Sequence, residues 1–186
     1  MHLRRFPRSR AAPSSGGFTM LEVIIAITLL IVAFAGVLSS VVSTTNLNRT
    51  NREMSLAAEA AQATIEGLKN TTFAQVFATF NANPADDPGG AGTAPGSGFA
   101  VQGLNIRPGD ADGLVGQIMF PTTGNQLRED GVDNALGMPR DLDLDLAIDA
   151  ADHSLDYGIL PVRVRVQWTG AGGNRQIDIV TVLANL

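Results

Sequence analysis

The chain has 186 residues, of which 45% are hydrophobic, and this length suits one modest domain with a processing segment. It contains no cysteine, which excludes disulfides, iron–sulfur clusters and cysteine-ligated zinc. The formal net charge is −5, and the acidic excess disfavours nonspecific binding of nucleic acid.

Residues 1–17 form a basic segment rich in proline, serine and glycine. The segment has no apolar periodicity and no acidic residue, so we expect a disordered leader. It holds four of the 13 lysines and arginines of the chain: Arg4, Arg5, Arg8 and Arg10. Removal of the leader would leave nine basic and 18 acidic side chains, a formal charge of −9.

A twenty-residue stretch without charge follows at 23–42. As a helix it would cover roughly 30 Å, the thickness of a bilayer's hydrocarbon core. We therefore predict a transmembrane segment at about 18–42. The arginines before it place the N-terminus in the cytoplasm and the remainder outside. A secretory signal peptide has a shorter apolar run, whereas an ordinary signal anchor fits the length and charges equally well.

Glu22 lies at the edge of this apolar run. A carboxylate so close to hydrocarbon is costly and indicates a functional role with a partner. The alternative is a side chain that reaches to the lipid headgroups without a further role.

The sequence GFTMLEVIIAITLL, at 17–30, resembles the processing and methylation motif of type IV pilins and type II secretion pseudopilins. In that family a short basic leader ends in glycine, phenylalanine usually follows, and glutamate is the fifth residue of the mature chain. Gly17, Phe18 and Glu22 occupy these positions, and Thr19 and Leu21 also suit the pattern. The motif covers about the first quarter of the chain.

The resemblance implies a mechanism and a set of partners. A prepilin peptidase would cut between Gly17 and Phe18 and methylate the new amine of Phe18. Glu22 would then neutralise the N-terminal amine of a neighbouring subunit in a filament core, where an unpaired charge is costly. The chain would be a minor pilin or pseudopilin, held in the inner membrane before it assembles with other pilin or pseudopilin subunits.

The helical pattern continues beyond the membrane segment. Apolar residues recur at spacings of three and four and predict one buried stripe: Met54, Ala57, Ala58, Ala61, Ile65 and Leu68. Phenylalanines at 73–80 extend or cap this helix, so we predict a long N-terminal helix over 18–80. Its part from 18 to 69 would be about 78 Å long.

Residues 81–186 are predicted to form a globular head of α+β class. A glycine- and proline-rich loop occupies 81–98. Alternating apolar residues and a turn predict a C-terminal hairpin within 161–184. Short or alternating apolar runs predict the strands 99–104, 117–120, 161–168 and 176–183. A small antiparallel sheet that packs on the lower half of the long helix would complete a pilin-like head.

Residues 141–152 form an acidic loop, DLDLDLAIDAAD. Five aspartates occupy positions 1, 3, 5, 9 and 12 of this window: Asp141, Asp143, Asp145, Asp149 and Asp152. The spacing is similar to that of EF-hand and dockerin-type calcium loops. Leu146 stands where those loops have glycine, and the last ligand is aspartate instead of glutamate. The alternatives are a calcium site and solvated carboxylates on an exposed strand or short helix.

We expect no catalytic residues. The two histidines are His2, in the leader, and His153, beside the acidic loop, and no serine lies in a nucleophile-elbow pattern. The remaining alternative to a filament subunit is a signal-anchored extracytoplasmic protein with a binding or catalytic head.

Overall fold

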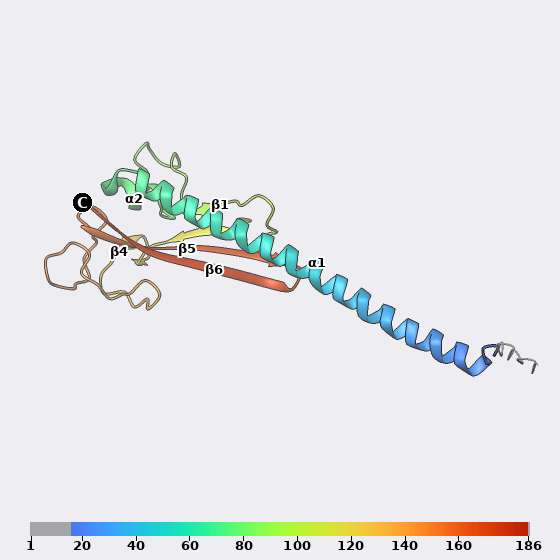
Figure 1. Cartoon of the computed structure of the whole chain (residues 1–186). Helices are drawn as coiled ribbons and strands as arrows, with labels where there is room; N and C mark the ends of the chain where they lie inside the picture. The colour runs from blue at the N-terminus through green and yellow to red at the C-terminus, as the bar shows by residue number, and fades with distance from the viewer. Residues whose placement is uncertain (1–15, 186) are drawn as a thin grey trace, which may run out of the picture. The chain divides into compact units, whose positions relative to one another are not determined.

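The computed structural model describes residues 16–185. Helix α1 runs from Met20 to Asn70, and the short helix α2 from Phe73 to Phe80 (Figure 1). The one helix predicted over 18–80 is therefore two helices. The break falls at Thr71 and Thr72: the Thr71 hydroxyl donates to the Gly67 carbonyl at 3.0 Å, and Thr72 has non-helical backbone with ψ 123°. β-branched side chains that bond the backbone compete with helix continuation.

The described chain divides into two compact units, with the boundary between Thr45 and Asn46. In the first unit, α1 carries an apolar stretch that is long and apolar enough to cross a membrane. None of the residues in its most apolar window is buried within the chain. This exposure is expected of a segment whose surroundings are lipid or other helices and not its own domain.

The second unit contains the rest of α1, which buries one face. Its buried residues recur at helical spacing: Glu53, Ala57, Ala61, Ile65 and Leu68. The predicted stripe is therefore largely confirmed. Met54 differs, because it is 40% exposed and Glu53 is buried in its place, and Ala58 is only half-buried.

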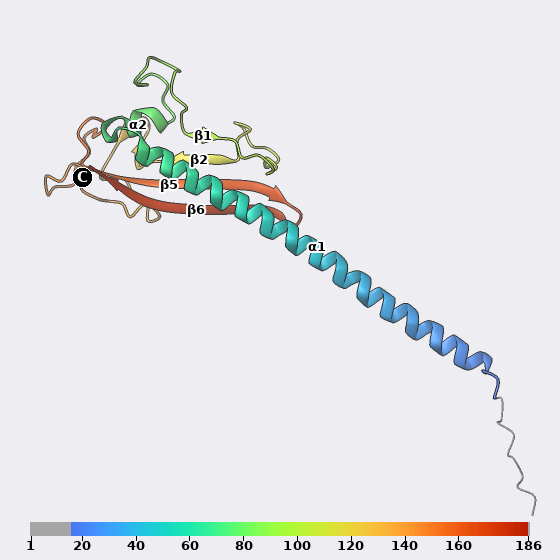
Figure 2. The same ribbon diagram turned by 45° about the horizontal axis from the view of Figure 1, so that its top comes forward.

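The fold is α+β, with α1 packed against a four-stranded antiparallel sheet of order β1-β2-β5-β6 (Figure 2). The strands are β1 (Gly98–Phe99), β2 (Gly116–Met119), β5 (Ile159–Gly170) and β6 (Gly173–Ala184). The predicted hairpin is confirmed, and β5 and β6 pair over all twelve residues. Every second residue of β5 from Leu160 to Trp168 is buried in the core that includes α1.

Two smaller features differ from the prediction or were absent from it. The predicted strand at 99–104 contributes only Phe99 to the sheet, while Val101 and Leu104 pack on the core from a loop. A two-stranded ladder, β3 (Thr122–Thr123) with β4 (Gln126–Leu127), was not predicted. Strands of two residues carry too little periodicity to be recognised in a sequence.

Tyr157, just before β5, links that segment to α2. Its hydroxyl donates to the Phe73 carbonyl at 2.6 Å and accepts the Phe77 N–H at 3.3 Å. Its ring lies 5.0 Å from the ring of Phe73, between centroids. The acidic loop follows β4 in the chain and leads to Tyr157, so this contact holds the far end of the loop in place.

Candidate functional site

The N-terminal motif begins in non-helical backbone and enters α1. Gly17 and Phe18 precede the helix, and Phe18 is 81% exposed. Glu22 lies in the first turn of α1 and is exposed. Within residues 16–185 its carboxylate has no hydrogen-bonding or ion-pairing partner. The leader at 1–15 lies outside the described residues.

Thr19 is the cap of α1, a role that was not predicted. Its hydroxyl accepts the Glu22 N–H at 3.3 Å, and its carbonyl accepts the Val23 N–H at 3.2 Å. The sequence signal is Thr-x-x-Glu before an apolar run, the pattern of a capping box. Glu22 therefore has a second physical role, because an acidic side chain in the first turn also stabilises a helix through its dipole.

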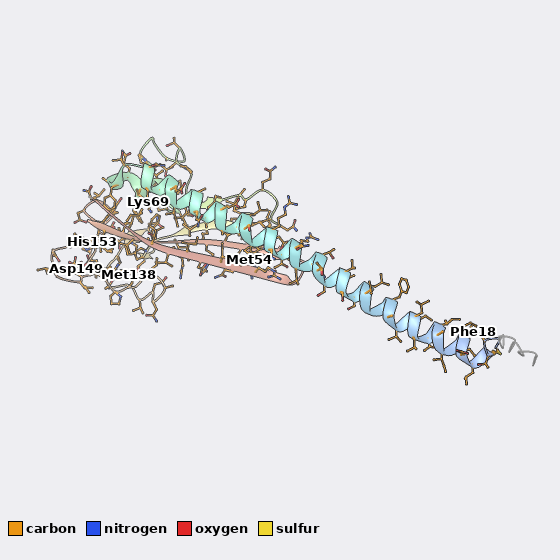
Figure 3. The ribbon with its side chains drawn as sticks, viewed as in Figure 1. Phe18, Met54, Lys69, Met138, Asp149 and His153 are labelled. Atoms are coloured by element: carbon orange, nitrogen blue, oxygen red, sulfur yellow. The ribbon has the colours of Figure 1, made fainter. Side chains whose placement is uncertain are left out.

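The acidic loop surrounds a buried carboxylate and a buried imidazole. Glu129, which follows β4, is 1% exposed, and His153 is 4% exposed. Figure 3 shows His153 and Asp149 in the same region of loops, at the end of the head distant from Met54. Glu129 was not predicted as part of this region, although it is the only glutamate after Glu66.

Glu129 organises the backbone of the loop. One carboxylate oxygen accepts the N–H of Leu142 and the N–H of Asp143, and the other accepts the N–H of Asp149 at 3.2 Å. Its own carbonyl accepts the N–H of Arg140 at 3.1 Å. Because charge-assisted bonds to backbone N–H are strong, this buried carboxylate fixes both ends of the segment between residues 142 and 149.

His153 lies between four carboxylates. Its Nε2 is 3.2 Å from Asp149 Oδ1 and 3.8 Å from Glu129 Oε2. Its Nδ1 is 3.2 Å from Asp156 Oδ1 and 3.6 Å from Asp143 Oδ2. Burial lowers the pKa of His153, but the hydrogen bond with Asp149 and the charges of Glu129, Asp156 and Asp143 outweigh burial and raise the pKa above its usual value.

Two aspartates of the loop have shifted pKa values. The Ala151 N–H and then His153 hold the pKa of Asp149 below its usual value. For Asp143 the N–H of Asp145 acts in the same direction, but burial and the charges of Asp145 and Glu129 together raise its pKa. The loop is therefore a centre of interacting charges and not a row of independent solvated carboxylates.

The five aspartates of the predicted calcium loop do not form one group. Asp141 and Asp143 have oxygens within 4.8 Å of each other and of Glu129, and Asp149 joins Glu129 and His153. Asp145 bonds the Ala147 N–H at 2.7 Å, outside these groups. Asp152 also lies outside them: one oxygen accepts the N–H of Leu127 at 3.1 Å, and the same oxygen accepts that of Ser154.

The backbone of the loop turns where a calcium loop would have glycine. Leu146 has φ 74° and Leu144 has φ 69°, both in the left-handed region that side chains rarely adopt. The two carboxylate oxygens of Asp141 accept the N–H of Leu144 at 2.6 Å and of Leu146 at 2.8 Å. These bonds offset the strain, so the left-handed turn forms without glycine.

The side chains around the acidic loop form two kinds of possible metal-binding group. Glu129, Asp141 and Asp143 supply only oxygen, the ligand that calcium prefers. The other two groups include the His153 imidazole, a ligand that suits transition metals better than calcium. As an ion-paired cation, the same imidazole would also balance part of the negative charge of the loop.

No protein-family model, curated protein or solved structure matches this chain.

Proposed function

We propose that the chain is a structural subunit of a filament, a minor pilin or pseudopilin of a type IV pilus or a type II secretion pseudopilus. The observation that carries the proposal is α1. One helix from Met20 to Asn70 has an apolar N-terminal part that the chain leaves exposed and a C-terminal part that is buried against the sheet. A subunit of this kind is stored in the inner membrane and later exchanges lipid for neighbouring helices.

The position of the motif supports processing by a prepilin peptidase. Gly17 and Phe18 lie in exposed, non-helical backbone immediately before α1, where a protease can bind an extended substrate. A cut between them would release the basic leader on the cytoplasmic side and create an amine at Phe18, the proposed site of N-methylation. The head would remain on the periplasmic or extracellular side.

Glu22 would act one turn into the helix. It has no partner among residues 16–185, and a carboxylate without a partner is costly in an apolar filament core. The Phe18 amine of a neighbouring subunit would supply the opposite charge and favour one register of assembly. Other subunits, the peptidase and membrane lipid are the proposed partners. Nucleic acid is not among them, because the mature chain would be strongly acidic.

The test of this role removes the charge of Glu22 and keeps the size of its side chain. Glu22→Gln removes the charge but keeps a side chain that suits the capping box. We expect the variant to be cut normally, with mass spectrometry showing a start at Phe18, and to be lost from filaments. Glu59→Gln, an exposed change on the same helix, is the control and should incorporate normally.

Two results would contradict the proposal. Incorporation of Glu22→Gln at the level of the unchanged chain would show that filament assembly does not need the charge of Glu22. A native chain with an N-terminus other than Phe18 would remove the processing step and favour the alternative, a signal-anchored protein with a binding or catalytic head.

We further propose that the acidic loop binds calcium. The observation in favour is the group of three carboxylates, Glu129, Asp141 and Asp143, whose oxygens lie within 4.8 Å of one another. A cation there would reduce the mutual repulsion of the loop. Saturating calcium should raise the melting midpoint of the full chain above its value in a chelator, and Asp141→Asn should reduce that rise. An unchanged midpoint would contradict a stabilising site.

A further inference from the structure

The sheet has two very different edges. β1, at one edge, has two residues, whereas β6, at the other, has twelve. Natural sheets usually protect their edges by short strands, prolines, lysines or bulges. β6 contains no proline and no lysine, and its register with β5 is unbroken from Gly173 to Ala184. The edge formed by β1 is therefore too short to pair with another strand over any length, whereas the edge formed by β6 is long and regular.

The backbone groups that face the open edge follow from the ladder. The N–H of Gln167 donates to the Val115 carbonyl at 2.7 Å, on the side of β5 away from β6. Opposite residues in an antiparallel pair alternate between hydrogen-bonded and non-bonded pairs, so Gln176, opposite Gln167, directs its N–H and C=O outward. The same holds for every second residue: Asn174, Gln176, Asp178, Val180, Val182 and Ala184.

These outward groups have no partner in residues 16–185. The backbone of β6 makes no hydrogen bond with any described segment other than β5. Val180 is 45% exposed and Val182 is 44% exposed. The charge of Asp178 does not prevent another strand from pairing at this edge, because its carboxylate is bound by Arg165 of β5 at 2.8 Å. The edge therefore presents alternating donors and acceptors beside apolar side chains.

An apolar groove adjoins the C-terminal end of β6. Its volume is about 300 Å³, at the lower end of the range for ligand pockets. The lining comes from the end of α1, the start of α2 and the end of β6: Leu68, Lys69, Thr71, Phe73, Val76, Val182, Leu183 and Ala184. Lys69 at the end of α1 is labelled in Figure 3. The groove is of a size and polarity to receive an apolar side chain.

We propose that an extended segment of another protein adds to β6 as a further strand and inserts an apolar side chain into this groove. The chemistry of the edge selects the occupant, because donors and acceptors at the spacing of a strand match only another extended backbone. Main-chain hydrogen bonds supply affinity, and the groove supplies specificity. The proposal goes beyond filament assembly and does not depend on Phe18 or Glu22.

The test uses hydrogen exchange of individual amides in the full chain in detergent micelles. The probe is a twelve-residue peptide of alternating valine and threonine, N-methylated at every second residue so that only one edge can form hydrogen bonds. Its addition should slow the outward amides of Gln176, Asp178, Val180 and Val182 by about tenfold or more. The inward amides of Ile179 and Thr181, already bonded to β5, should change little.

Two variants and a control peptide make the test specific. Val180→Pro removes one outward N–H and should abolish the slowing at the remaining outward amides, since proline is tolerated where an edge N–H faces solvent. Val182→Lys keeps every backbone N–H but places a charge at the groove, and should weaken binding at least about tenfold even where the proline variant fails to fold. A peptide N-methylated at every residue should have no effect.

Three outcomes would overturn the proposal. Outward amides that do not slow at millimolar peptide would show that the edge does not accept a strand. Equal slowing by the fully methylated peptide would show binding without backbone pairing. Outward amides already protected in the protein alone would show that this chain or a second copy covers the edge.

Discussion

Glu53 is a charged residue in the core of the head. Its carboxylate accepts the indole N–H of Trp168 at 3.2 Å and pairs with Arg49 at 3.2 Å. A side chain at Gly170 would overlap with the same carboxylate and displace it, so glycine at this position favours the contact. One glutamate therefore links α1 to β5 through a contact that hydrophobic patterning does not predict.

We predict that Glu53→Ala destabilises the head. The change leaves the buried Trp168 N–H without a partner, at a cost of about 1–3 kcal/mol. Urea unfolding of the full chain in detergent micelles measures the loss. Glu59→Ala, an exposed change on the same helix, should alter stability by about 0.5 kcal/mol or less. Equal losses in the two variants would contradict the assigned role of Glu53.

The surroundings of His153 lead to a second prediction, which concerns the pH dependence of stability. Its pKa is raised in the folded chain, so its contribution to stability is complete below the unfolded pKa of about 6.5. That contribution is lost as the pH rises through the folded pKa. Without calcium, the melting midpoint should therefore fall as the pH is raised above about 6.5, and His153→Gln should flatten this dependence. The same slope in the variant would assign the dependence to other groups.

At the scale of elements, the two parts of α1 differ in the pattern of their apolar residues. Its first part carries the uninterrupted apolar stretch, and its later part has a single buried face. The acidic loop has almost no regular secondary structure and depends instead on Glu129 and on short aspartate-to-backbone bonds. The hairpin of β5 and β6 differs again: β5 is covered on both sides, while β6 leaves one edge open.

At the scale of the whole molecule, the unit from Asn46 to Leu186 contains all the core residues of the described chain. We predict that a chain beginning at Asn46 folds on its own and is soluble. The buried residues of α1 begin at Glu53, so the truncation removes no core contact. Circular dichroism should show a cooperative melt.

A matched variant tests whether that fold is the one described. Ala61 is fully buried, and Ala61→Asp should prevent cooperative folding of the shortened chain because it buries an unpaired charge. A broad, non-cooperative melt of the unsubstituted chain would show that the head needs residues before Asn46.

The sequence by itself determined the features that depend on neighbouring residues. The apolar stretch, the buried stripe of α1 and the C-terminal hairpin follow from periods of 3.6 and 2 that hold over many residues. The small ladder of β3 and β4 and the division between α1 and α2 were missed, because a few residues carry little pattern. Only the tertiary structure joined Glu53 to Trp168, 115 residues apart, and placed Glu129 among the aspartates of the loop. It also decided that β6 ends the sheet, since strand order arises from packing between distant segments and leaves no local trace in the sequence.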